Sequence, residues 1–216
     1  MLFWKQLRKG RSPLDMPPLR VPGQSVEAEF YLRFVKTIGF WILMAIYVLI
    51  MACLEWTRFL WSPQPHPLMY SIFAGVVLVL AAFRINAHFP ALARLYQGFM
   101  GERVVGQMLE ELRPKGYRVF HDLIGSEWNV DHVMVGPAGV FVIETKAIRK
   151  PRGRKPNISY DGNQILVDGY TPDRDPIVQT KATVRYVRRL IETDTGKRPP
   201  IRGVVLYPGW FIEHQP

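Results

Sequence analysis

Two long uncharged apolar runs constrain this chain more than any other feature. The first covers Ile38 to Leu54 and the second covers Leu68 to Phe83. Both are apolar on every side of a helix rather than along one stripe, which is typical of segments surrounded by lipid. With their flanks, both reach the roughly 17 to 25 residues that a membrane-spanning helix needs. We therefore predict a transmembrane hairpin over residues 34–90. The alternative is a pair of helices buried in a soluble bundle.

The distribution of basic residues predicts how this hairpin is oriented. The formal net charge is +10, and seven Lys or Arg residues precede the first apolar run. The link between the runs, residues 55–67, carries one Lys or Arg residue, Arg58. Because basic residues favour the cytoplasmic side, we expect a multi-pass protein of the cell inner or plasma membrane with both termini in the cytoplasm. Residues 1–33 are predicted to be a basic, poorly ordered cytoplasmic tail. The single cysteine, Cys53, excludes an intramolecular disulfide.

The remaining segment, residues 91–216, centres on the phrase NVDHVMVGPAGVFVIETK at residues 129–146. Two alternating apolar runs flank a Gly-Pro-Ala-Gly turn, which predicts a β-hairpin. If Gly136–Gly139 form a four-residue loop, Val135 pairs with Val140, and Asp131 then lies opposite Glu144. Like charges at that separation, about 4.5–5.5 Å between Cβ atoms, repel one another. We therefore predict that Asp131 and Glu144 bind a hard divalent cation, Mg²⁺ or Mn²⁺.

Lys146 lies two residues beyond Glu144 on the same face of the strand. Its ammonium group would then stand beside the metal and orient an attacking water or a phosphate oxygen. The simpler interpretation is a solvated hairpin end that carries three ordinary charges.

Two flanking helices offer further candidate site residues. A helix is predicted over residues 91–112. Its apolar stripe comprises Val105, Met108, Leu109 and Leu112, and Glu102 lies at the edge of this stripe. Glu102 is either a surface acid or a group that faces the hairpin carboxylates. A second helix begins at Asp175-Pro176, an N-cap followed by a first-turn proline. Gln179 lies at the edge of its apolar arc, and a buried glutamine there needs a partner, which the hairpin site offers.

Strands are predicted over residues 117–123 and 201–207, and a second hairpin over residues 157–168 with Asp161-Gly162 in its turn. A basic loop follows the first hairpin, where it could neutralise a phosphate backbone or contact lipid headgroups. Its cations are Arg149, Lys150, Arg152, Arg154 and Lys155.

The order of these elements resembles the PD-(D/E)XK nuclease superfamily. More narrowly, the phrases GERVVGQMLEEL, NVDHVMVGPAGVFVIETK and VVLYPGW resemble the NERD, or nuclease-related, domain. The resemblance covers about Gly98 to the C-terminus and does not extend to the apolar runs. The sequence departs from the superfamily's PD motif in one respect: Val130 rather than proline precedes Asp131.

The resemblance implies an α/β fold with a restriction-endonuclease-like core, in which a mixed central sheet is flanked by helices. It also implies metal-dependent phosphodiester hydrolysis, with Asp131 and Glu144 as metal ligands and Lys146 near the attacking water. Glu102 and Gln179 carry over as supporting members of the catalytic site. The predicted partners are nucleic acid, with DNA favoured over RNA, and the lipid bilayer. The alternative function is a non-catalytic membrane-tethered module that binds nucleic acid, lipid or a protein.

Overall fold

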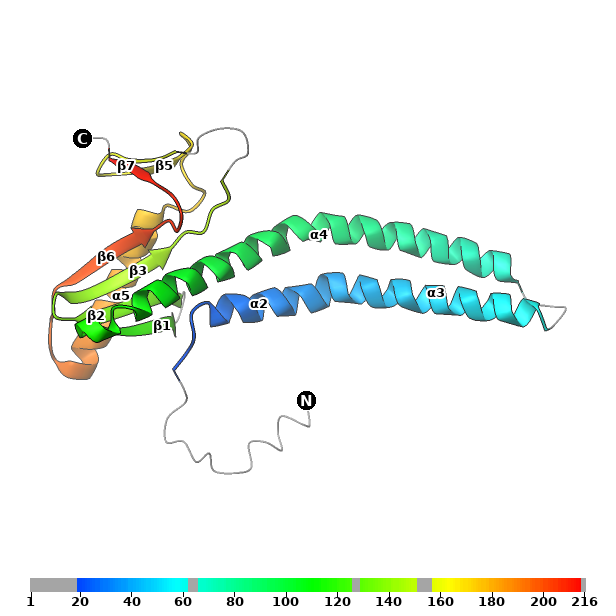
Figure 1. Ribbon diagram of the computed structural model, residues 1–216, viewed down its shortest axis with the longest axis horizontal. Coiled ribbons are helices and arrows are strands. Elements are labelled where there is room, and N and C mark those ends of the chain that lie inside the picture. The colour runs from blue at the N-terminus through cyan, green and yellow to red at the C-terminus, as the bar shows by residue number, and fades with distance from the viewer. Residues whose placement is uncertain (1–18, 62–65, 126–128, 151–156, 215–216) are drawn as a thin grey trace, which may run out of the picture.

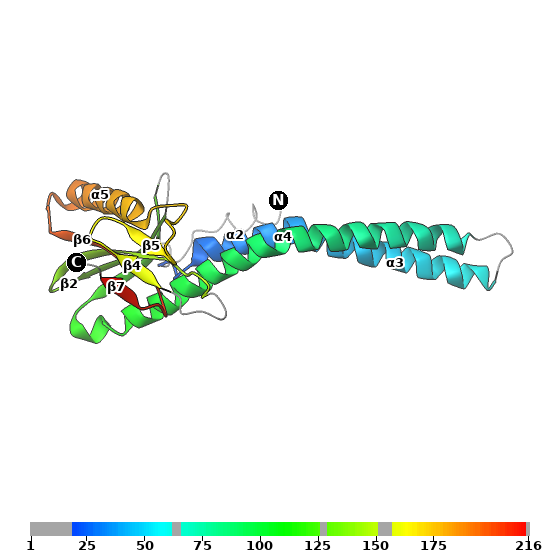
Figure 2. The same cartoon turned by 90° about the horizontal axis from the view of Figure 1, so that it is seen from above.

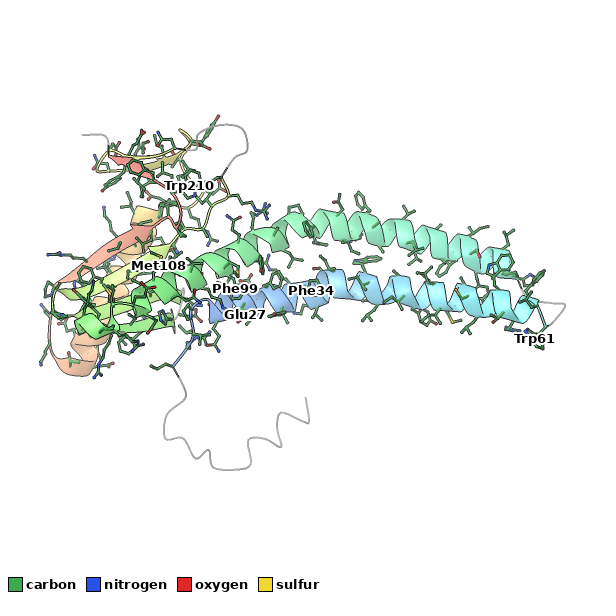
Figure 3. The ribbon with its side chains drawn as sticks, in the orientation of Figure 1. Glu27, Phe34, Trp61, Phe99, Met108 and Trp210 are labelled. Atoms are coloured by element: carbon green, nitrogen blue, oxygen red, sulfur yellow. The ribbon has the colours of Figure 1, made fainter. Side chains whose placement is uncertain are left out.

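A long helical hairpin projects from an α/β domain (Figure 1). The computed structural model describes residues 19–61, 66–125, 129–150 and 157–214. Figure 2 shows that the two arms run side by side along their length, and Trp61 marks their far tip (Figure 3). The first arm consists of α2 (Gln24–Phe34), a π-helical segment η1 (Val35–Gly39) and α3 (Phe40–Phe59). The second arm is α4 (Pro67–Glu110).

Both arms are long and apolar enough to cross a membrane, by length and composition. Only 17% of the most apolar window of the first arm and 11% of that of the second are buried. The side chains buried where the arms meet are small or medium-sized: Val48, Ala52 and Ala74. Among the described residues, these helices therefore do not form the core of a bundle, because a core helix would be mostly buried.

The hairpin reaches further into the domain than the sequence predicted. Gln24–Phe34 is helical rather than part of a disordered tail, because α2 packs against α4. The rings of Phe30 and Tyr96 lie 5.7 Å apart, and Arg103 contacts Glu27 at 3.3 Å. Residues 1–18 of the predicted tail lie outside the described residues.

The predicted boundary between anchor and domain, at residues 90 and 91, falls inside α4, which continues through Pro90. A proline inside a helix removes one hydrogen bond but need not end the helix. Figure 1 shows that α4 is bent along its length.

The central sheet is mixed, with strand order β1-β2-β3-β6. Helix α4 covers one face, where Val105 and Leu109 pack against Val119, and α5 (Pro176–Thr195) covers the other, where Val187 packs against Val142. The predicted α/β class, a mixed sheet flanked by helices and preceded by a hairpin of two apolar helices, is confirmed. The strands are β1 (Arg118–Ile124), β2 (Asn129–Gly136), β3 (Gly139–Thr145) and β6 (Ile201–Leu206). Among the described pairs of this sheet, only β3 and β6 are parallel.

A smaller sheet lies beyond the ends of β3 and β6 (Figure 1). Its order is β5-β4-β7, from β4 (Ile158–Tyr160), β5 (Ile165–Val167) and β7 (Ile212–His214). The antiparallel pair β4–β5 confirms the predicted second hairpin. Trp210, labelled in Figure 3, follows β6. Its indole N–H donates to the Ile148 carbonyl at 3.1 Å and so joins the segment before β7 to the chain after β3.

The local signals for the first hairpin and for α5 are largely confirmed. Val135 pairs with Val140 as predicted, but Gly136 also pairs with Gly139, so the loop holds two residues rather than four and the register is unchanged. Asp175 accepts hydrogen bonds from the backbone N–H groups of the first turn of α5, as an N-cap does.

Candidate active site

The open end of the β2–β3 hairpin brings two carboxylates together. The ladder's last pair is His132 with Ile143, so Asp131 and Glu144 occupy the next opposed positions. The Thr145 backbone N–H donates to Asp131 Oδ2 at 2.7 Å and fixes the carboxylate against the neighbouring strand. Glu144 is only 3% exposed. The interpretation of this place as a solvated hairpin end is therefore wrong.

Lys146 links the hairpin to α5. Its ammonium Nζ lies 2.7 Å from Glu144 Oε1 and 2.8 Å from Gln179 Oε1. Gln179 is in the first turn of α5, where the Asp175 cap fixes the start of the helix. The structure thus brings together the lysine and glutamine that the sequence analysis selected, although their catalytic roles stay predictions.

Glu102 reaches the same place from α4 on the other face of the sheet. It is 8% exposed, so the interpretation of Glu102 as a surface acid is wrong. Gly101 makes this approach possible, because a Cβ at that position would lie 2.3 Å from the Ala147 Cβ. Met108 was assigned to the apolar stripe of this helix, but it is 62% exposed and does not join the core (Figure 3). The buried face follows Glu102, Val105 and Leu109 instead.

Burial and mutual repulsion disfavour negative charge on these acids. The pKa of Glu102 is raised from its ordinary value of 4.5 to about 9 by burial and then by the charges of Asp131, Asp122 and Glu144. The pKa of Asp131 is raised to about 7 by burial and by Glu144, although Thr145 and Lys146 oppose the rise. Without a further cation the site therefore retains protons at neutral pH.

The chemistry of Asp131 and Glu144 fits a hard divalent cation. Among the described residues, no three His, Cys, Asp or Glu side chains group closely enough to hold a metal ion by themselves. Mg²⁺, however, is commonly held by one or two carboxylates together with water and substrate phosphates. Two opposed carboxylates, of which Glu144 is buried and Asp131 half-buried, match that requirement because their charges repel each other.

The raised pKa of Glu102 predicts how stability depends on pH. Between about pH 4.5 and 9 the folded protein keeps a proton on Glu102 that the unfolded chain has released, so the free energy of unfolding falls as pH rises. Glu102→Gln removes this titration. In EDTA, we expect the variant to unfold at a higher temperature than the wild type at pH 8 and to show a flatter dependence on pH. Parallel curves for the two proteins would contradict this placement of Glu102.

The structure describes only part of the predicted basic loop. Arg149 donates to Gln97 Oε1 on α4 at 3.1 Å. The ammonium group of Lys150 lies 5.9 Å from the ring centre of Trp210. Arg152, Arg154 and Lys155 lie outside the described residues. Nucleic-acid binding by this loop stays a prediction.

Asp122 is a residue that the sequence analysis missed. The β1–β2 register places it opposite Asp131, but its φ of +49° takes it out of the ladder. Its carboxylate, 1% exposed, accepts hydrogen bonds from Arg20 Nε at 2.7 Å and from the Ser25 backbone N–H at 2.8 Å. The start of the first helical arm is thus attached to the strand beside the site. The signal for Asp122 is the pairing of the β1 and β2 sequences, which places it opposite Asp131.

A buried histidine pair lies on the α4 side of the same strands. His121 Nδ1 and His132 Nδ1 are 2.9 Å apart, and His121 Nε2 is 2.8 Å from Glu110 Oε1. Burial, and secondarily His121, lowers the pKa of His132 to about 3, so this ring is neutral at physiological pH. The pair joins β1, β2 and α4, and we assign it no chemical step.

Comparison with known proteins agrees with this geometry. Residues 97–208 match the family described as the nuclease-related domain, NERD, a match over more than half of the 216 residues. A stretch of 84 residues is 32% identical to an uncharacterized protein of Bacillus anthracis, and it covers 37% of this chain and 38% of that protein. The aligned stretch therefore spans well under half the length of this relative. No solved structure is significantly similar to the chain.

Proposed function

This chain belongs to the nuclease-related domain family, and from that premise we propose that it is a membrane-anchored, metal-dependent nuclease. It hydrolyses phosphodiester bonds of nucleic acid, DNA in preference to RNA, on the cytoplasmic side of the cell inner or plasma membrane. One observation carries the proposal. The Lys146 ammonium group, held between Glu144 and Gln179, lies at the strand ends where Asp131 and Glu144 oppose each other.

Asp131 and Glu144 are the residues that would hold Mg²⁺ or Mn²⁺, which when bound supplies Lewis-acid polarisation of the phosphate and lowers the pKa of water. The Thr145 N–H holds Asp131 in place, and Gln179 holds Lys146. Lys146 can donate a hydrogen bond to a phosphate oxygen or to the attacking water and thereby orient it. Glu102 is buried beside these groups, and without a bound cation its burial and the neighbouring acids raise its pKa to about 9.

The hairpin supports the membrane part of the proposal. The apolar run of α4 ends at Phe83, and Glu102 follows 19 residues later in the same helix, about 28 Å along its axis. A bilayer around the apolar runs therefore leaves the site in water, on a rigid helical support. The basic residues near the domain end favour the cytoplasmic side for it.

The test is a cleavage assay on the full chain in lipid nanodiscs. Linear and circular DNA and a matched RNA are incubated with Mg²⁺, Mn²⁺ or EDTA. We expect products with either cation, faster with DNA, and none in EDTA. Binding that falls with salt and gives no products with any divalent cation would instead identify a non-catalytic module.

A further inference from the structure

A groove of about 690 Å³ lies between α5, the edge strand β6 and the small sheet. One wall is the exposed face of α5, which carries Lys181, Arg185 and Arg188. The floor is largely apolar. Its side chains come from all three elements and include Tyr160, Ile165, Ile177, Val205 and Ile212.

Among the residues that the structure describes, no acidic side chain neutralises the three cations of this wall. Within the described part of the chain, Lys181, Arg185 and Arg188 form no ion pair. Glu192, an acid of the same helix, is instead bound to Arg198, whose Nε lies 2.6 Å from its Oε1. Exposed basic side chains that line an apolar groove without acidic partners suit an anionic ligand.

The spacing of these cations matches a phosphate backbone. Intervals of four and three residues place them on one helix face, where they extend over about 10 Å along the axis. Along a duplex axis each strand carries a phosphate about every 3.4 Å, and an extended single strand spaces its phosphates more widely, so this length faces about two to three phosphates. The floor provides apolar contact for unpaired bases and one aromatic ring, Tyr160, and single-strand binding proteins commonly stack bases on aromatic side chains.

The groove lies beside the candidate active site. Ile177 and Thr180, two of its lining residues, flank Gln179 in sequence. Val205, on its floor, is the ladder partner of Glu144. A strand that leaves the carboxylates along α5 therefore enters the groove directly.

We propose that this groove binds single-stranded nucleic acid as it extends from the candidate active site, with its phosphates facing Lys181, Arg185 and Arg188. That the strand is a substrate rests on the proposed nuclease function, but its binding does not. The surface differs from the predicted basic loop, which follows β3 rather than lying on α5.

The test measures binding of a fluorescein-labelled 12-nucleotide single-stranded DNA to the full chain in zwitterionic nanodiscs, by fluorescence anisotropy over a range of salt concentrations. All proteins carry Asp131→Asn to prevent cleavage. The triple variant K181A/R185A/R188A is compared with K115A/R189A/K197A, which has the same change in net charge outside the groove. Loss of three phosphate contacts is expected to weaken binding at least ~10-fold and to reduce the salt slope by about 2. The control variant is expected to bind within about twofold of the parent.

Equal weakening by the two triple variants, or unchanged binding by the groove variant, would overturn the proposal. So would loss of binding to phosphatidylserine vesicles with retained oligonucleotide binding, because the groove would then be a lipid site. The two proposals fail separately. If the groove variant binds more weakly but the wild-type chain cleaves no nucleic acid, only the nuclease function is contradicted. If the wild-type chain cleaves nucleic acid but the groove variant binds normally, only the proposed binding role of the groove is contradicted.

Discussion

Replacing Asp131 with asparagine is expected to slow phosphodiester cleavage roughly 100-fold to 1,000-fold. Asparagine preserves the volume of the side chain, and its carbonyl oxygen can still accept the Thr145 N–H that now binds Oδ2 at 2.7 Å. The change removes one of the two opposed carboxylates that would hold the cation. Single-turnover rates of the full chain in nanodiscs, with protein in excess over DNA, measure the chemical step without product release.

Asp173→Asn is the matched control, because Asp173 is an exposed acid outside the candidate site. It makes the same chemical change, and we expect the rate to stay within about twofold of the wild type. A rate for Asp131→Asn close to that of the control, with unchanged thermal unfolding, would remove Asp131 from the active site.

Gly101→Ala is expected to destabilise the folded chain by about 1–3 kcal/mol, the usual cost of overpacking. The added methyl group would lie 2.3 Å from the Ala147 Cβ, which has no rotamer through which to withdraw. Either α4 or the end of β3 must therefore move. Since Glu102 follows Gly101 directly, cleavage is expected to fall at least ~10-fold, as small misplacements of catalytic groups are costly. Thermal unfolding and the single-turnover rate measure the two effects.

Gly98→Ala provides a control on the same helix. A Cβ at Gly98 meets no atom within 4 Å. Alanine inside a helix is favoured over glycine by about 0.5–1 kcal/mol, so this variant is expected to be slightly more stable and fully active. If Gly101→Ala and Gly98→Ala change stability in the same direction, the close contact between Gly101 and Ala147 is contradicted.

Much of the candidate site could be predicted because its signals are local. The alternating runs around the Gly-Pro-Ala-Gly turn set the register that opposes Asp131 with Glu144. The Asp175-Pro176 cap sets the start of α5 and so places Gln179 in its first turn.

The features that the sequence did not predict depend on contacts between distant segments. Asp122 joins the site through the β1–β2 register and a positive φ, and it binds Arg20 across 102 positions of sequence. The groove requires β6 to pair in parallel with β3, and no local pattern indicates that pairing. Residues 24–34 contain few strongly apolar positions in a stripe, so their helix depends on packing against α4.

The contact between Asp122 and the first helical arm has an experimental consequence. Arg20 and Ser25 bind a carboxylate that is 1% exposed, next to Asp131 in the sheet. A fragment that begins near Gly98 would lose both partners and leave a buried charge without compensation, which is costly. The full chain is therefore the appropriate material for every measurement on this site.

Isothermal titration calorimetry of Mn²⁺ binding to the full chain tests the central claim most directly. The wild type, Asp131→Asn and the control Asp173→Asn are compared in nanodiscs at pH 8. If Asp131 and Glu144 form the metal site of a nuclease, the wild type and the control bind the ion and Asp131→Asn loses that binding. Equal binding by all three proteins, or no binding by the wild type even with DNA present, would contradict the claim.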